Sequence, residues 1–259
     1  MSSYLHDLEA ANRQRKVMDE RDHRPWPLPD GPWIMGQTWE QLMFAHWRVP
    51  FEALREVVHP NIPLDTFDGS AWLGVTPFTV TGLHLHATPP PPLVSSFHEI
   101  NVRTYSTIDG KPGVYFLSLD AASRMAVETA RRVYRVPYFQ AEIEVEQVGE
   151  RRRYTSERTQ PDSPAAAFAA EYGPTGQVYN AAPGSFDYWL AERYCLYTVD
   201  DTQSVRRGEI HHPPWPLQSA TAEITHNTMA TPYGIDLRGD PVCHYASRQD
   251  VVFWPLGRS

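Results

Sequence analysis

Polar side chains that could do chemistry alternate along one short run of the sequence, FHEINVRTYS (residues 97–106). They occupy every second position: Glu99, Asn101, Arg103 and Tyr105. On a β-strand alternate residues share one face, so these four would point the same way. Facing inward they are costly unless they pair with one another or meet a ligand. A Glu–Arg pair beside a carboxylate-sized space could bind an acid and tune a proton donor, whereas the same pattern also fits a solvent-facing edge strand.

Histidines offer a weaker chemical signal. His84 and His86 have the spacing of two metal ligands on one face of a strand. The remaining candidates are scattered later in the chain: His211, His212, His226 and His244. Each is isolated in sequence from a third ligand, so we expect surface or hydrogen-bonded histidines and no metal site.

Composition excludes several classes of protein. The chain of 259 residues has a net charge of −8, which disfavours nucleic-acid binding. No nucleotide-binding loop, zinc-protease motif or nucleophile elbow occurs. The polar start lacks the apolar core of a signal peptide, and no apolar run reaches membrane-spanning length. The two cysteines, Cys195 and Cys243, are interpreted as free thiols. We therefore expect a cytoplasmic protein without a membrane partner.

The elements that must position these groups are mostly strands. The 24 prolines and many short apolar runs indicate a mainly β fold with a few short helices. We expect residues 1–32 to form a helical and proline-rich extension, and residues 33–259 to form one mostly antiparallel β domain. Residues 39–49 read as its first strand, and Asp68-Gly69 as a hairpin turn. Residues 161–174 read as a loop with at most one helical turn.

Helices are expected at three further places. The run 51–58 has apolar residues at helical spacing and ends at Pro60. Residues 123–134 and 184–194 also read as helical, with Ser123 and Ser185 available as N-caps.

Several segments together resemble one family. The runs FAHWRV, DTFDGSAWLGVTPF, HEINVRTY, GVYFLSLDA, RYCLYT and HHPPWPLQSA are similar to the DUF2071 family, a branch of the acetoacetate-decarboxylase-like superfamily. The resemblance covers roughly residues 33–256. It implies a cone-like antiparallel β-barrel with flanking helices and a central, mostly apolar cavity.

The resemblance also marks a missing lysine. In acetoacetate decarboxylases a lysine forms a Schiff base with the keto acid, and a neighbouring lysine lowers its pKa. The matching stretch here is ARRVYRVPYFQA (residues 130–141), which places Tyr138 and Phe139 where those lysines stand. A phenol cannot form an imine. The chain's two lysines, Lys16 and Lys111, lie in the extension and in a turn, so we expect no Schiff-base decarboxylation.

Other family positions carry over in part. Arg48 and Glu99 fall where the decarboxylases keep a pocket arginine and a pocket carboxylate. Arg131 matches a motif arginine, while Arg132 replaces the motif's glutamate and reverses the local charge.

These residues lead to a functional hypothesis. It is a cofactor-independent lyase- or isomerase-type enzyme acting on a small carbonyl or carboxylate compound. Glu99 would exchange the proton, Tyr138 would donate to a carbonyl oxygen, and Arg103 would stabilise negative charge. The remaining substrate contacts would be Arg48, Asn101, Tyr105 and Arg131.

Two alternatives stay open. The same cavity, without a nucleophile, could belong to a non-catalytic binding protein for a keto acid or an apolar metabolite. A role in assembly is the other, because the extension and the aromatic loop PPWPL (residues 213–217) could form a homo-oligomer interface.

Overall fold

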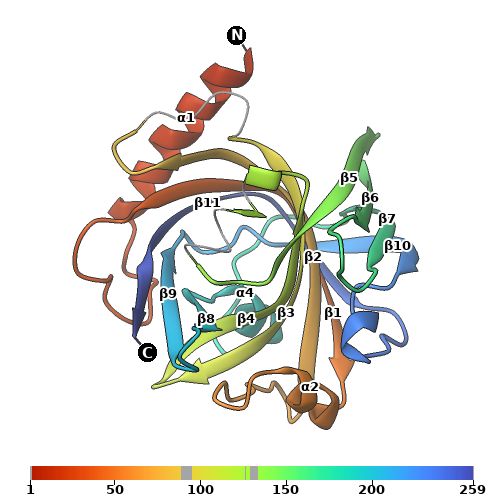
Figure 1. Ribbon diagram of the computed structural model, residues 1–259. Coiled ribbons are helices and arrows are strands. Elements are labelled where there is room, and N and C mark those ends of the chain that lie inside the picture. The colour runs from red at the N-terminus through yellow and green to blue at the C-terminus, as the bar shows by residue number, and fades with distance from the viewer. Residues whose placement is uncertain (1, 89–94, 126, 129–133, 259) are drawn as a thin grey trace.

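A ring of strands forms the body of the protein in the computed structural model (Figure 1), which describes residues 2–88, 95–125, 127–128 and 134–258. The strands are β1 Met35–Val49, β2 Ala71–Leu85, β3 Phe97–Ile108, β4 Lys111–Ala121, β5 Tyr138–Val148, β6 Arg151–Arg158, β7 Ala167–Pro174, β8 Cys195–Val199, β9 Val205–His211, β10 Gln218–Asn227 and β11 Val242–Arg258. The helices are α1 Ser2–Lys16, α2 Phe51–Val57 and α4 Phe186–Ala191, with short 3-10 turns at Val17–Asp19 and Thr231–Tyr233. The expected mainly β class is confirmed.

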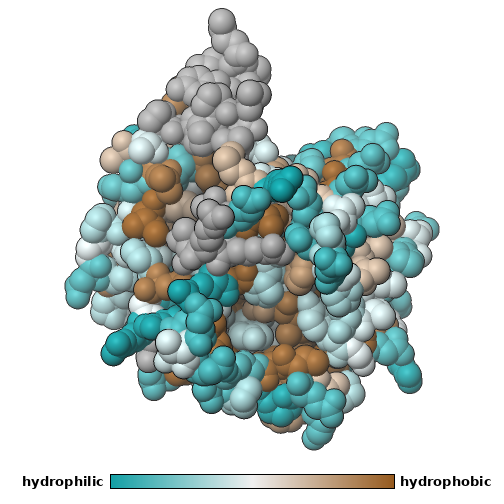
Figure 2. All heavy atoms as spheres, viewed as in Figure 1, coloured by the Kyte–Doolittle hydropathy of each residue, from teal (hydrophilic) through white to brown (hydrophobic). Residues whose placement is uncertain are grey.

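Pairing of the first and last strands closes the ring. Neighbours run β1-β2-β3-β4, β4 pairs with β8, β8 with β9, β9 with β11, and β11 returns to β1. All these pairs are antiparallel except β4 with β8. A second, smaller sheet, β5-β6-β7-β10, branches from β4 and rejoins at β11. It stands to one side of the ring, and the face of its strands seen in Figure 2 is mainly hydrophilic.

Strand burial separates the two largest clusters of the core. Inside the ring, an aromatic-rich cluster includes Phe44, Trp72, Phe78, Tyr105 and Trp215. Outside it, alternate residues of the same strands pack against the second sheet and α2. Strands such as β3 are therefore buried on both faces, which excludes the solvent-facing reading of its polar row. A hollow of about 610 Å³ lies outside the ring along Arg21–Pro29.

Turn chemistry follows the sequence closely. Asp68-Gly69 and Asp109-Gly110 both adopt positive φ, as the tight turns between paired segments require. Ser185 caps α4 by accepting a hydrogen bond from the Tyr188 amide at 3.2 Å. The loop expected at 161–174 is wrong in its second half, because Ala167–Pro174 pairs with β6 and β10 as strand β7. The helix expected at 123–134 falls partly outside the described residues.

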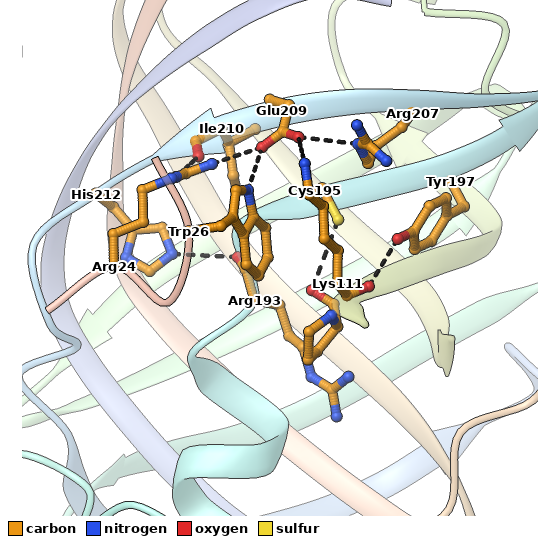
Figure 3. Close-up of polar contacts among 11 residues, drawn as sticks. Arg24, Trp26, Lys111, Arg193, Cys195, Tyr197, Arg207, Glu209, Ile210 and His212 are labelled. Carbon is orange, nitrogen blue, oxygen red and sulfur yellow. Dashed lines mark hydrogen bonds and ion pairs between the residues drawn. The ribbon is translucent and has the colours of Figure 1, made fainter. Parts of the chain in front are cut away.

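The N-terminal segment packs against the ring. The Gln14 side chain donates to Thr38 Oγ1 at 2.9 Å, and α1 lies across β1 and β2. Farther along, Arg24 reaches Glu209 Oε2 at 2.5 Å and the Ile210 carbonyl oxygen (Figure 3). None of the helices in the described part of the chain is long and apolar enough to cross a bilayer.

Candidate functional site

The polar row of β3 lies inside the ring, as its alternation predicts. Glu99 faces the same side as Phe78, its partner on β2, which belongs to the interior cluster. The whole row is buried, with exposed fractions of 3% for Glu99, 4% for Asn101, 8% for Arg103 and 0% for Tyr105. The apolar residues between them face the outer cluster.

Glu99 meets Tyr138 in this interior. The parallel pairing of β5 with β4 sets Tyr138 beside Leu119, and its hydroxyl donates to Glu99 Oε2 at 2.8 Å. Burial raises the pKa of Glu99 to about 8, the nearby Asp120 adds to the rise, and the Tyr138 hydrogen bond offsets part of it. Burial and the Glu99 charge raise the pKa of Tyr138 well above its usual value. Near neutral pH the pair is thus a largely protonated carboxyl group and a neutral phenol, which is suited to proton exchange.

Arg103 is a buried cation without an ion-pair partner among the described residues. Its guanidinium carbon lies 4.9 Å from the centre of the Phe44 ring and 5.9 Å from that of Tyr105. Its Nε is enclosed and finds no hydrogen-bond acceptor in the described chain. A buried guanidinium in this state is costly on its own and is a ready site for an anion.

The sequence reasoning missed His46 on β1. Its Nε2 lies 2.5 Å from the Tyr105 hydroxyl, and both side chains are buried. Burial, and then the charges of Arg103 and His244, hold the pKa of His46 well below its usual value. A signal was present, because His46 stands two positions after the buried Phe44 in a run that reads as a strand.

A second polar group, which joins the candidate His244 to residues not singled out in the sequence, lies at the same end of the ring. His244 Nε2 on β11 is 3.0 Å from Asp187 Oδ1 on α4, and Tyr179 donates to the other oxygen of Asp187 at 2.8 Å. Helix α4 covers the interior here: Phe186 lies against Trp72 with ring centres 4.2 Å apart. No local sequence signal joins these residues, since they meet only through the long-range pairing of the ring.

One expected site residue is not in this group. Arg48 is exposed at the end of β1, where it lies over the Trp72 ring and donates to Ser70 Oγ at 3.2 Å. Arg131 lies outside the described residues. In the loop at 213–217, Trp215 is only 2% exposed and packs on Phe44 inside the ring.

Neither lysine reaches the interior. Lys16 ends α1, and Lys111 begins β4 on the outer side, where it lies 3.5 Å from Glu209 and over the Trp26 ring. Among the residues that the structure describes, no group of three His, Cys, Asp or Glu side chains could hold a metal ion. His84 is buried and its Nδ1 donates to the Gly82 carbonyl oxygen at 3.1 Å, while His86 packs on Trp33.

The ring with its flanking sheet defines the acetoacetate-decarboxylase-like fold. The acetoacetate decarboxylase from Legionella pneumophila matches with a TM-score of 0.59 and 11% identity, covering 93% of this chain and 94% of that one. The enduracididine biosynthesis enzyme MppR complexed with pyruvate matches with a TM-score of 0.58 and 11% identity, over 92% and 94% of the two chains. An acetoacetate decarboxylase-like enzyme from Sphingomonas wittichii RW1 matches with a TM-score of 0.54 and 11% identity, over 91% and 98%.

Sequence comparison identifies the family. Residues 36–250 match the DUF2071 family, described as an uncharacterized conserved protein. The chain is 46% identical over 230 residues to the uncharacterized protein YqjF of Bacillus subtilis (strain 168). The aligned region covers 88% of this chain and 94% of that protein. The protein belongs to the DUF2071 family.

Proposed function

We propose that the protein is a cofactor-independent enzyme of the lyase or isomerase type. It moves protons on a small carbonyl or carboxylate compound held inside the ring. The observation that carries this proposal is the Glu99–Tyr138 pair, a buried carboxyl group with a pKa of about 8 that receives a 2.8 Å hydrogen bond from a phenol. A carboxyl group titrating near neutral pH can both take and return a proton.

In the proposed reaction, Glu99 both removes and returns the proton. Ionised Glu99 takes a proton from a carbon next to the substrate carbonyl, and the C–H electron pair forms a C=C bond while the carbonyl pair moves to oxygen. The resulting enolate is stabilised by the positive charge of Arg103 and by a hydrogen bond from the Tyr138 hydroxyl. In a substrate with a β,γ double bond, return of the proton from Glu99 to the γ-carbon moves the double bond into conjugation and gives an isomer. In a substrate with a leaving group on the β-carbon, the carbonyl re-forms, a C=C bond forms between the α- and β-carbons, and the group departs with its electron pair and takes the proton from Glu99, which gives a lyase reaction.

The lysine positions support acid–base chemistry over imine chemistry. Lys16 and Lys111 both lie outside the ring, while Tyr138 stands beside Glu99. One protein of similar fold, the enzyme MppR, has a structure in complex with pyruvate, a small keto acid. This supports a small carbonyl or carboxylate compound as the substrate here.

The test is hydrogen–deuterium exchange into a panel of small keto acids and ketones in D2O, followed by NMR. We expect the wild-type protein to catalyse exchange at the carbon next to a carbonyl, and Glu99→Gln and Tyr138→Phe each to lower the rate at least about tenfold. Matched controls are Glu223→Gln, an exposed glutamate on β10, and Tyr154→Phe, a buried tyrosine of the outer cluster. Wild-type rates in both site variants would overturn the assignment. Binding of panel members without exchange would favour the alternative, a non-catalytic binding protein.

A further inference from the structure

His46 and Arg103 approach each other over a glycine. In the sheet register His46 of β1 lies opposite Gly74 of β2, and Gly74 lies opposite Arg103 of β3. A Cβ at Gly74 would stand 2.8 Å from His46 Nε2 and 3.5 Å from Arg103 Cγ. The missing side chain therefore leaves room for the His46 imidazole, with the aliphatic stem of Arg103 close by on the same face of the sheet.

Both groups of this pair keep an unused nitrogen. His46 Nδ1 and Arg103 Nε are buried, and neither has a hydrogen-bond partner in the described chain. When the Tyr105 hydroxyl donates to His46 Nε2, the neutral imidazole carries its proton on Nδ1 and can donate it. A cation and an adjacent N–H donor match the two oxygens of a carboxylate.

A second pair of unused polar groups follows one step along β3. Asn101 lies opposite Thr76 of β2, on the same face as Arg103. Both residues are buried, at 4% and 0% exposed, and Asn101 Oδ1 and Thr76 Oγ1 find no partner among the described residues. An oxygen acceptor beside a hydroxyl suits a ligand hydroxyl, which can donate to one and accept from the other. Buried groups left unpaired in this way are costly in the free protein.

The spacing of Arg103 and Asn101 along β3 sets the distance between the carboxylate and the hydroxyl of the ligand. Residues two apart on a strand are about 6.6 Å apart, so a hydroxyl three or four carbons along a chain could reach Asn101 while the carboxylate stays at Arg103. Glu99 is the next inward-facing residue beyond Asn101. At the α4 end of the ring, Trp189 packs on Tyr105 with ring centres 4.3 Å apart.

We propose that the ring interior binds a short hydroxy monocarboxylate. Its carboxylate contacts Arg103 and His46, and its hydroxyl contacts Asn101 and Thr76. This ligand rests on the proposed function, because it occupies the same inward face of β3 as Glu99.

The test is isothermal titration with three matched acids: pentanoate, 3-hydroxypentanoate and 4-hydroxypentanoate. We expect the wild-type protein to bind at least one hydroxy acid about tenfold more tightly than pentanoate. Asn101→Leu is expected to remove this difference while keeping pentanoate affinity. Gly74→Ala is expected to weaken all three acids about tenfold, because the new Cβ displaces His46. Gly176→Ala is the matched control, since its Cβ would make only an ordinary 3.6 Å contact.

Titration of the wild-type protein with the three acids tests the proposal even if a variant fails to fold. Equal affinity for pentanoate and both hydroxy acids would overturn the hydroxyl site, and absence of binding by all three would overturn the carboxylate site as well. Exchange into an uncharged ketone that depends on Glu99, without affinity for any of the three acids, would overturn this ligand and leave the proposed function standing. Loss of Glu99-dependent exchange with hydroxy-acid binding retained would do the reverse.

Discussion

The Tyr138 hydroxyl donates to Glu99 Oε2 at 2.8 Å, although the two residues are 39 positions apart and come from strands that do not pair with each other. Part of the Tyr138 residue reaches solvent, but its hydroxyl meets a carboxyl group that is 3% exposed. Burial raises the pKa of Glu99 and this contact offsets part of the rise, so both affect how stability and proton exchange depend on pH.

The first prediction concerns Glu99→Gln. The pKa of Glu99 is raised from 4.5 to about 8, so the folded state favours the protonated carboxyl group. That stabilisation is complete below pH 4.5 and is lost as the pH rises to about 8. Glutamine mimics the neutral acid at every pH. Relative to wild type, the free energy of unfolding of Glu99→Gln should therefore rise by a few kcal/mol between pH 4.5 and 8 and then level off.

Urea unfolding at a series of pH values measures this difference. Glu223→Gln on the exposed face of β10 serves as the control and should follow wild type throughout. A stability difference for Glu99→Gln that does not change with pH would mean that Glu99 is ionised in the folded protein across this range.

A second prediction concerns Tyr138→Phe. The Tyr138 hydrogen bond lowers the pKa of Glu99, because it stabilises the ionised carboxylate. Without the hydroxyl, the pKa of Glu99 should rise further, and the inflection in the pH profile of exchange should move upward. The NMR titration of the Glu99 side-chain carboxyl carbon gives the pKa directly. Tyr154→Phe should leave it almost unchanged, and a downward shift in Tyr138→Phe would contradict the assigned donor.

A third prediction separates the two arginines expected at the site. Arg103 is buried without an ion-pair partner in the described chain, so Arg103→Met should stabilise the free protein by about 1–3 kcal/mol and abolish carboxylate binding. Arg48 is exposed over Trp72, and Arg48→Met should change stability by less than about 1 kcal/mol. Urea unfolding and titration with pentanoate check both effects. Strong destabilisation by Arg103→Met would show that the guanidinium is already satisfied by the protein.

A fourth prediction concerns the attachment of the N-terminal segment. One carboxylate, Glu209, receives Arg24 at 2.5 Å, the Trp26 indole at 2.9 Å and Arg207 at 2.8 Å (Figure 3). Glu209→Gln leaves the buried Arg24 without its countercharge, which costs about 3–5 kcal/mol when a partner is removed. Faster hydrogen exchange over residues 17–28, with little change in β3, is expected. Uniform loss of protection across the ring would mean that this segment and the ring unfold together.

Local sequence signals predicted much of the fold. Period-two alternation placed the polar row of β3 on one face, and the Asp-Gly pairs and the Ser185 cap fixed their turns and helix. The segment Ala167–Pro174 was misread because its alanines and glycine carry little strand preference. It becomes a strand through pairing on both sides, with β6 and β10. That pairing is tertiary information, which a local pattern does not contain.

The site was predictable only along single strands. Glu99 and Arg103 stand out because they alternate with apolar residues, whereas His46 becomes part of the site only through the β1–β2–β3 register across Gly74. Likewise, Asp187 and His244 meet because α4 folds back over the end of the ring. Arg48 was expected in the pocket from its position in the family motif, yet its strand has already reached the rim there.

Closure of the ring by β1 and β11 has a consequence for synthesis. The Thr38 hydroxyl donates to Asp250 Oδ1 at 2.6 Å, across 212 positions of the chain. While the ribosome is still making the later strands, β1 has one open edge that only the final strand can cover. Contacts between such distant segments are slow to form and leave a partly folded chain prone to aggregation. The last step of folding should therefore wait until β11 has left the ribosome, and a nascent chain stalled before residue 242 should remain dependent on chaperones.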